Sequence, residues 1–335
     1  MNNYSVGITG VGKYLPEDTL TNHDLSKIVD TSHEWIVERT GIHERRIAKE
    51  NIAASDLGTE AARAALEDAK VRPEDIDLII VATTTADHAF PSTACIIQKN
   101  LGLTNAAAFD LSAACSGFVY GLATGSSFIS SGAYEKVLVI GSEVFSKIVD
   151  WKDRNTCILF GDGAGACILE RCEDGYGILS FDLGADGTGG DYLVVPAGGS
   201  RMPASHETIE DKLHSVQMDG KEVFKFGARI MEKATRNALE KANLTTDDLD
   251  FLVPHQANIR IIDSAAKKLK IDKNKLCINL EKYGNMSSAS IPVSLEEVVK
   301  SNRIKKGDIV VLVGFGAGLT WGSMAIKWNK GGEQD

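Results

Sequence analysis

The chain has 335 residues, of which 43% are hydrophobic and 24% are charged, and its formal net charge is −10. This length allows one large core or two compact units, and the composition argues against intrinsic disorder. The negative charge disfavours nonspecific binding to nucleic acid. No apolar run is long enough to cross a bilayer, and the N-terminus lacks the basic and apolar regions of a secretory signal. We therefore expect a globular protein with neither a nucleic-acid nor a membrane partner.

Cysteine and histidine are not spaced like the ligands of a structural metal or the members of a disulfide framework. The sequence contains no CxxC or HExxH arrangement, so we expect no metal site. The thiols are too scattered for a regular disulfide pattern, which favours a reducing compartment and a cytoplasmic location. The six cysteines are Cys95, Cys115, Cys157, Cys167, Cys172 and Cys277.

Amphipathic helices and buried strands alternate along the chain, and three segments recur at one spacing of 173 residues. A constant offset over three segments indicates duplication of a strand-and-helix unit. We place the two halves at residues 1–172 and 173–335 and predict an α/β fold. The matched segments are 61–83 with 234–256, 115–122 with 288–295, and 135–143 with 308–316.

A stripe of small residues marks the helix predicted after Cys115. Glycine recurs every four positions at Gly117, Gly121 and Gly125, which places the three on one helix face. Each glycine costs a helix about 1 kcal/mol relative to alanine, and close approach of another backbone can offset that cost. The duplicated helix carries Ser290 and Ser294 at the matching positions. We therefore expect the two helices to pack on each other, although a flexible glycine-rich loop is the alternative.

Cys115 stands in "DLSAACSGFVYGL", among side chains too small to shield it. The segment predicts a strand, a tight turn and then a helix that begins at the cysteine. A helix N-terminus presents unpaired N–H groups and a partial positive charge, so we expect the pKa of this thiol to be lowered. The same N–H groups could hold the oxyanion of an attacked carbonyl. A buried, inert cysteine is the commoner alternative, and we apply it to the other five.

Two polar residues of the second half are candidate partners for this thiol. His255 directly follows a strand pattern in "DFLVPHQAN", and Asn285 precedes the duplicated helix in "INLEKYGNMSSASI". A nucleophilic cysteine usually works with a histidine, and ligands of open α/β sheets bind beyond strand ends. Taken singly, the histidine could be structural and the asparagine could be a turn residue. We expect all three side chains to meet at the seam between the halves.

Four motifs in order, "DLSAACSGFVYGL", "VPHQANIRI", "YGNMSSASIPVSL" and "GFGAGLTWGS", resemble β-ketoacyl-acyl carrier protein synthase III. This family of condensing enzymes initiates type II fatty-acid synthesis, and the resemblance runs from "GITGVGKYLP" to "TWGSMAIKW". It implies an acyltransferase with a thiolase-like fold, in which two similar βαβαβαββ halves form a layered αβαβα arrangement. It also implies a homodimer.

The resemblance assigns a catalytic role to Cys115, His255 and Asn285. The cysteine would take a short acyl group from acyl-CoA, and malonyl-acyl carrier protein would then lose CO₂ and attack the acyl-cysteine. His255 and Asn285 would be neutral donors to the enolate oxygen. The backbone N–H groups of Cys115 and Ala317 would hold the acyl-transfer oxyanion. No cofactor is implied, because acyl-CoA is a substrate.

Further sites follow from the same resemblance. Trp35 and Arg39 in "WIVERTGI", together with Arg154, would bind CoA by stacking and by charge. Phe90 in "DHAFPS" would reach across the dimer to line the partner's acyl pocket. By spacing alone, the first three would be ordinary surface residues and the phenylalanine would be a core residue.

A basic cluster lies in "NIRIIDSAAKKLK", which reads as a helix. Arg260 and Lys267 lie two turns apart on one face, and Lys268 follows. Such a cluster is usually only a solvated face. On a chain of net charge −10 we interpret it as the docking site for the acidic carrier protein.

Other enzyme classes fit less well. A cysteine-dependent α/β-hydrolase does not predict the duplication. A thiolase would need a second late cysteine, and only Cys277 lies there. HMG-CoA synthase would need an acidic general base, and no glutamate is clearly placed. A non-catalytic relative would be expected to lose the nucleophile. The identity of the acyl primer stays open.

Overall fold

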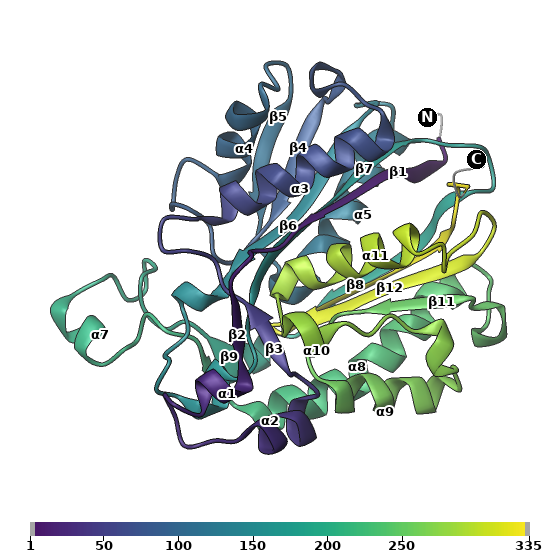
Figure 1. The fold of residues 1–335 in the computed structure, drawn as a ribbon. Helices are drawn as coiled ribbons and strands as arrows, with labels where there is room; N and C mark the ends of the chain where they lie inside the picture. Colours follow the sequence, from purple (N-terminus) through teal and green to yellow (C-terminus); the bar gives the residue numbers. More distant parts are fainter. Residues whose placement is uncertain (1–3, 332–335) are drawn as a thin grey trace.

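Two mixed β-sheets form the framework of the protein (Figure 1). The computed structural model describes residues 4–331. The first sheet has the strand order β1-β7-β6-β4-β5, and the second has the order β8-β13-β12-β11. The first sheet comprises β1 (Val6–Tyr14), β4 (Leu78–Ala82), β5 (Ala107–Leu111), β6 (Val137–Val144) and β7 (Asp162–Arg171). The second comprises β8 (Gly177–Ala185), β11 (Phe251–Pro254), β12 (Ile309–Gly316) and β13 (Thr320–Lys327).

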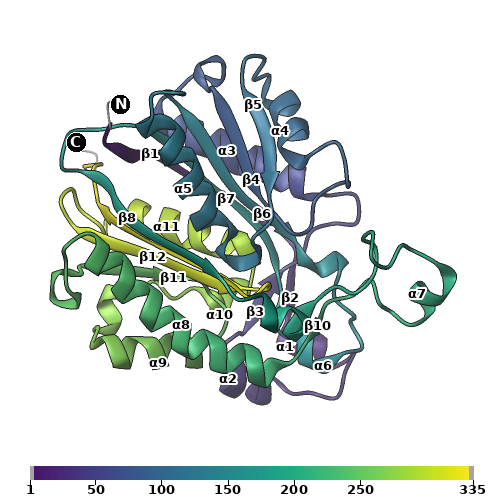
Figure 2. The same ribbon diagram turned by 180° about the vertical axis from the view of Figure 1, so that it is seen from behind.

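Helices form three layers around these sheets, which confirms the predicted αβαβα arrangement (Figures 1 and 2). The outer face of the first sheet is covered by α3 (Ala54–Ala69) and α4 (Thr93–Leu101). The outer face of the second sheet is covered by α8 (Gly220–Lys241) and α9 (Ile259–Leu269). The layer between the sheets contains α5 (Gly117–Ser130) and α11 (Ser290–Lys300).

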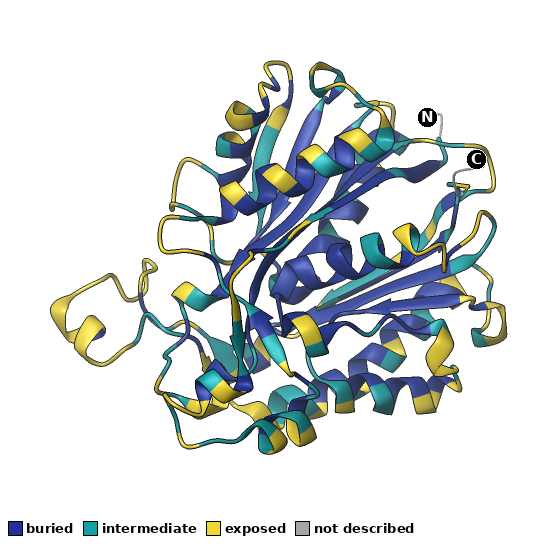
Figure 3. Cartoon of the chain, in the orientation of Figure 1, coloured by how far each residue is buried: buried dark blue, intermediate teal, exposed yellow. Residues whose placement is uncertain are grey.

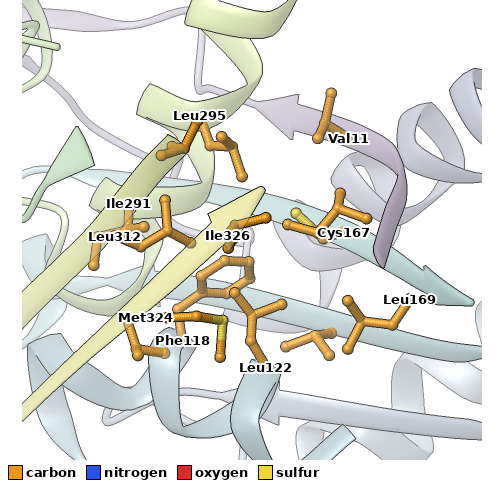
Figure 4. Packing of buried hydrophobic residues seen from close by; sticks show 14 of the residues in the cluster. Val11, Phe118, Leu122, Cys167, Leu169, Ile291, Leu295, Leu312, Met324 and Ile326 are labelled. Atoms are coloured by element: carbon orange, nitrogen blue, oxygen red, sulfur yellow. The ribbon is translucent and has the colours of Figure 1, made fainter. Parts of the chain in front are cut away.

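Burial follows from these layers. The outer helices expose one face to solvent, whereas the first turns of α11 are dark (Figure 3), and most residues of both α5 and α11 are buried. Phe118 and Leu122 of α5 join Ile291 of α11 in one core cluster, which Met324 of β13 completes from the second sheet (Figure 4). A helix that is apolar all round is stable only where it is covered on every side. The apolar composition of α5 therefore requires the sandwiched position.

The two halves repeat each other in detail. The helical turn η2 (Ala114–Ser116) precedes α5, and its counterpart η7 (Ser287–Ala289) precedes α11, 173 residues later. Ala114 has φ 47° and Ser287 has φ 46°, so even an unusual left-handed residue recurs. Strands β4 and β11 pair in parallel with β6 and β12, which pair antiparallel with β7 and β13. The boundary after residue 172 stays a prediction; β7 ends at Arg171 and β8 begins at Gly177.

Shorter elements are inserted between the repeated ones. Most of them gather at one end of the molecule, and α7 projects away from the body (Figure 1). They are β2 (Thr19–Thr21), α1 (Asn22–Leu25), α2 (His33–Thr40), β3 (Glu44–Arg46), α6 (Arg154–Cys157), β9 (Leu193–Val194), α7 (His206–Glu210), β10 (Gln217–Met218) and α10 (Leu280–Tyr283). The turns η1, η3, η4, η5 and η6 are single 3₁₀ segments at 73–75, 145–147, 187–192, 246–248 and 273–275.

The prediction that the glycine stripe of α5 packs on α11 is wrong. A Cβ at Gly121 would lie 2.8 Å from the side chain of Val139, and one at Gly125 would lie 3.0 Å from Val137. Both valines belong to β6, so the stripe lets the helix settle on branched side chains of the first sheet. Only Gly117 also approaches the other half, where a Cβ would lie 3.8 Å from that of Ser288.

The halves interlock through a reciprocal contact between main chains. A Cβ at Gly141 of β6 would overlap the carbonyl oxygen of Ser288 in η7. At the equivalent place, a Cβ at Gly314 of β12 would lie 2.9 Å from the carbonyl oxygen of Cys115 in η2. Each central strand therefore requires glycine where the other half's helix-start turn crosses it.

Replacing Gly141 by alanine should destabilise the fold. The added methyl group meets backbone that cannot rotate away, and overpacking of this kind costs about 1–3 kcal/mol. The free energy of unfolding in urea measures the loss. Gly199, around which nothing lies within 4 Å of an added Cβ, provides the matched control, and Gly199→Ala should unfold like the wild type. Equal midpoints for the two variants would contradict the contact.

Candidate active site

Cys115 lies at the start of α5, at the centre of the molecule. Its turn follows β5 and is held from the second half, where Thr320 Oγ1 donates to the Ala113 carbonyl at 2.9 Å. The Ser116 hydroxyl donates to the same Thr320 oxygen at 2.9 Å. These bonds stabilise the left-handed conformation of Ala114, which directs the next residue toward the seam.

His255 and Asn285 reach this seam from the second half. His255 directly follows β11; its N–H donates to the Val313 carbonyl at 2.7 Å, and its ring packs edge-on against Phe315. The main chain of Asn285 is paired on both sides with the segment at 159–161. Its Oδ1 accepts the N–H of Ser287 at 2.8 Å. This bond orients the amide so that the Nδ2 group remains available to a ligand.

One cavity brings these three residues together. It has a volume of about 80 Å³, and Cys115, His255 and Asn285 all line it. The three are 4%, 1% and 7% exposed, so the site is nearly closed to water. A larger groove of about 680 Å³ lies beside α3, but it contains none of the predicted site residues.

The absence of a side chain at Gly316 lets β12 lie against the Cys115 thiol. A Cβ at Gly316 would lie 2.7 Å from the Cys115 nitrogen and 3.1 Å from its sulfur. Ala317 comes next and is half-buried, and its carbonyl oxygen lies 3.0 Å from the Thr320 hydroxyl oxygen, an alternative acceptor for the same proton. The main chain that follows β12 therefore begins beside the sulfur, while the oxyanion role of the Ala317 N–H stays a prediction.

The prediction of a lowered thiol pKa is wrong. The pKa of Cys115 is raised to about 12, mainly by burial; the Ser287 hydroxyl opposes this rise and the nearby Glu143 carboxylate adds to it. The free energy lost when a thiolate is removed from water exceeds the free energy gained from the N–H groups of the first turn of α5. Burial also lowers the pKa of His255 to about 3. The resting site therefore holds a neutral thiol and a neutral imidazole at neutral pH.

Glu143 was missed by the sequence analysis, which found no clearly placed glutamate. It lies at the end of β6, is fully buried, and has a pKa that burial raises above its usual range. The sequence did contain a sign of this residue: the predicted buried strand "VLVIGSE" ends in a carboxylate. The sequence does not reveal which groups surround this carboxylate. Ser288, whose hydroxyl donates to Glu143 at 2.9 Å, is 145 residues away along the chain.

The three predicted CoA-binding residues form a stack. The Arg39 and Arg154 guanidinium carbons lie 4.8 Å and 4.9 Å from the centre of the Trp35 ring. The carbonyl of Arg39 accepts the side-chain amide of Asn258 at 3.0 Å, and Asn258 lines the cavity. The stack therefore adjoins the site, and its role in CoA binding stays a prediction.

The remaining predicted residues lie on the surface. Phe90 is 86% exposed, so the alternative of a core phenylalanine is wrong. Arg260, Lys267 and Lys268 are exposed on α9. The Arg260 guanidinium lies 5.9 Å from the ring of Phe224, which lines the cavity, whereas Lys268 donates to a carbonyl of α8. The arginine thus lies beside a residue that lines the cavity.

Within residues 4–331 no group of histidine, cysteine or acidic side chains is arranged to hold a metal ion. Over the same residues no helix has both the length and the apolar character needed to cross a membrane.

A thiol, a neutral imidazole and an amide that line one cavity, at the seam of two similar halves, are the groups that an acyl-transferring enzyme with a cysteine nucleophile needs. Models of the 3-oxoacyl-[acyl-carrier-protein] synthase III family match residues 109–187 and, for its C-terminal part, residues 239–328. The β-ketoacyl-[acyl-carrier-protein] synthase III of Caldanaerobacter subterraneus is 61% identical over 97% of this chain and 98% of its own. That of Clostridioides difficile is 57% identical over 97% and 99%. The chain therefore belongs to this synthase III family of fatty-acid synthesis, and it is an acyltransferase.

Solved structures agree with this assignment. The 3-oxoacyl-[acyl-carrier-protein] synthase III of Aquifex aeolicus is 47% identical, with a TM-score of 0.89 over 96% of this chain and all of that chain. The enzyme from Thermus thermophilus is 45% identical, with a TM-score of 0.90 over 98% of this chain and all of that chain. The thiolase-like fold is thereby confirmed.

Burial of His255 should make stability depend on pH. The unfolded chain takes up a proton near the ordinary pKa of 6.5, but the folded protein does so only near 3. Stability is therefore present above the unfolded value and is lost as the pH falls between the two. The free energy of unfolding should drop by about 1.4 kcal/mol per pH unit from this residue. Urea unfolding at a series of pH values measures the slope.

The control compares two histidine variants. His255→Gln should lack this part of the slope, whereas replacement of the exposed His88 by asparagine should keep it. Identical slopes for the wild type and His255→Gln would show that the imidazole is not buried as described.

Proposed function

We propose that the enzyme condenses a short acyl group from acyl-CoA with malonyl-acyl carrier protein, with loss of CO₂, to start fatty-acid synthesis. The observation that carries the proposal is the single cavity shared by Cys115 of one half and His255 and Asn285 of the other. Its small volume of about 80 Å³ favours a short primer. No cofactor takes part, because the acyl group passes from one thioester to the next.

The first half-reaction forms an acyl-cysteine. The Cys115 sulfur attacks the thioester carbonyl and loses its proton as the new carbon–sulfur bond forms. The bond between the acyl group and CoA breaks, and the CoA thiolate takes up one proton to leave as free CoA. The N–H groups of Cys115 and Ala317 stabilise the tetrahedral oxyanion, and donors of this kind each contribute about 3–4 kcal/mol. The glycine at 316 supports this role, because it lets the strand that leads to Ala317 lie against the cysteine.

The second half-reaction decarboxylates the malonyl group. Loss of CO₂ places negative charge on the thioester oxygen of the resulting enolate, and His255 and Asn285 donate hydrogen bonds to it. Neutral donors suit this step because a fixed anion would oppose the developing charge. His255 is neutral because its pKa is lowered, and Asn285 is neutral because an amide carries no charge. The enolate carbon then attacks the acyl-cysteine and releases 3-ketoacyl-carrier protein.

The surface residues serve the two substrates. The adenine of CoA stacks on Trp35 in place of one guanidinium, and Arg39 and Arg154 then face its phosphates. The acidic carrier protein docks on α9, where Arg260 lies beside the cavity and Lys267 and Lys268 extend the positive surface. Local positive charge on a chain of net charge −10 steers an acidic partner to this one face.

The enzyme is proposed to work as a cytoplasmic homodimer. Strand β5 is the last strand of the first sheet and has a free edge, with Phe109 and Leu111 half-buried. An exposed apolar edge is a ready surface for pairing with a second copy. The exposed Phe90 is then placed to enter the partner's acyl pocket. All six cysteines are unpaired, which suits a reducing compartment. Sedimentation that gives only the mass of one chain would contradict the dimer.

Acyl transfer should depend on Cys115 alone among the three central residues. Mixing the protein with acetyl-CoA should give one acetyl adduct by intact mass, and Cys115→Ala should give none. His255→Ala and Asn285→Ala should still acylate but should lose at least about a hundredfold in malonyl decarboxylation, since each removes one donor. An adduct that persists in Cys115→Ala would place the nucleophile elsewhere.

The two substrate surfaces should be separable. Trp35→Ala should raise the KM for acyl-CoA about tenfold, because base–aromatic stacking contributes about 1–3 kcal/mol, and should leave the KM for malonyl-carrier protein unchanged. Arg260→Glu should raise the KM for malonyl-carrier protein, more so at low salt, and should leave acylation by acyl-CoA unchanged. Each variant is the control for the other. A rise of both KM values in either variant would refute the separation.

A further inference from the structure

The carboxylate of Glu297, on α11, binds both ends of the short helix α10. At the start of that helix, Asn279 Nδ2 donates to Glu297 Oε2 at 2.9 Å. At its other end, the Tyr283 hydroxyl donates to Oε1 at 2.7 Å. Lys13 of β1, in the first half, donates to the same Oε1 at 3.0 Å. Burial acts to raise the pKa of Glu297, but these three donors outweigh it and lower the pKa, so the side chain is an ionised acceptor at neutral pH.

Helix α10 needs these bonds to stay in place, and it leads into Asn285. The helix has four residues, and a helix this short is unstable without tertiary contacts. Gly284 follows Tyr283 with φ 65°, a conformation that favours glycine, and Asn285 comes next. Residues 159–161 bind the main chain of Asn285 from one side. The bond from Tyr283 to Glu297 fixes the segment that enters Asn285 from the other side.

The start of α10 is connected to His255 through Gln256, which is fully buried. Gln256 Nε2 donates to the carbonyl of Pro254, the residue before His255, at 2.8 Å. Gln256 Oε1 accepts the N–H of Asn279 at 3.1 Å. Asn279 is therefore bonded through its main chain to the residue that follows His255 and through its side chain to Glu297.

We propose that Glu297 is a positioning residue that sets the spacing between His255 and Asn285. Two hydrogen bonds to one enolate oxygen require both donors to lie at hydrogen-bond distance at the same time. Glu297 does not line the cavity, so it acts through the segments that carry the two donors. The turn that carries Cys115 is held instead by Thr320 and by β12, so acyl transfer does not depend on Glu297. This inference rests on the proposed roles of His255 and Asn285.

The competing explanation is that Glu297 only ties α11 to the first half through Lys13. Asp68 of α3 makes a tie of that kind, because its carboxylate accepts the side chain of Lys300, the last residue of α11, at 2.6 Å. It also accepts Lys330. Neither of these lysines belongs to the segments that carry the two donors. Asp68→Asn is therefore the matched control for the loss of a carboxylate that anchors the same helix.

The test measures the two half-reactions separately. Quenched intact-mass spectrometry follows acetyl-adduct formation with acetyl-CoA, and CO₂ release follows decarboxylation of malonyl-acyl carrier protein. Glu297→Gln keeps the size of the side chain but places an N–H where Asn279 or Tyr283 donates. It should lower kcat for CO₂ release about tenfold, less than the loss of a whole donor, with KM for malonyl-acyl carrier protein unchanged. Acetyl-adduct formation should keep the wild-type rate, and Asp68→Asn should keep both rates.

A double-mutant cycle shows whether the effect passes through Asn285. Tyr283→Phe removes one hydrogen bond to Glu297 and leaves the ring in place. It should slow CO₂ release about fivefold, the equivalent of one ordinary hydrogen bond. In the Asn285→Ala background the same substitution should have no further effect, because the donor that it positions is gone. If Glu297→Gln does not fold in a thermal melt, this cycle alone decides.

Three results would overturn the positioning role of Glu297. They are an equal effect of Tyr283→Phe in both backgrounds, an equal loss of both half-reactions in Glu297→Gln, and a selective loss of CO₂ release in Asp68→Asn. Each of them would leave the proposed function intact. Wild-type CO₂ release by Asn285→Ala itself would instead overturn the proposed function.

Discussion

Strand β12 of the second half lies directly against the main chain of Cys115, and strand β6 of the first half lies in the same way against Ser288. Both contacts require glycine, at Gly314 and Gly141. They bring the two helix-start turns, η2 and η7, side by side in the middle of the molecule. Because each turn precedes a helix buried between the sheets, neither can shift without disturbing the core. This reciprocal contact therefore holds the candidate active site rigid.

Burial of the residues around these two turns determines which of their side chains are charged. A cysteine at a helix start would be acidic on the surface, but here the loss of water dominates and the thiol is neutral. The same loss of water keeps His255 neutral, which suits a donor to a developing enolate. Burial likewise raises the pKa of Glu143 in the same interior, and the hydrogen-bond donors around its carboxylate oppose only part of that shift. Closure to water thus keeps both the thiol and the imidazole neutral.

Several features could be predicted because they depend on local pattern or on repetition. The strand and helix pattern is carried by the period of apolar residues, and the duplication by a constant offset that packing does not change. The meeting of Cys115, His255 and Asn285 at one cavity could be expected because each stands at the end of a strand or the start of a helix, in a setting that ordinary core residues do not need. The thiolase-like fold and the family follow from these same motifs.

Other features could not be predicted, since they depend on atoms that are distant in sequence. The prediction that α11 packs on the glycine stripe was wrong. A helix face without side chains fits the valines of a sheet as well as it fits a second helix, and the sequence does not distinguish the two. Glu143 was overlooked because its donors lie at residues 83–85 and 288.

The sequence by itself therefore determined the elements, their duplication and the three candidate residues that the cavity brings together, all of which are properties of short segments. The tertiary structure alone decided the protonation of those groups. A pKa is set by the water that folding removes and by charges brought from elsewhere in the chain, and neither is visible until the halves are packed together.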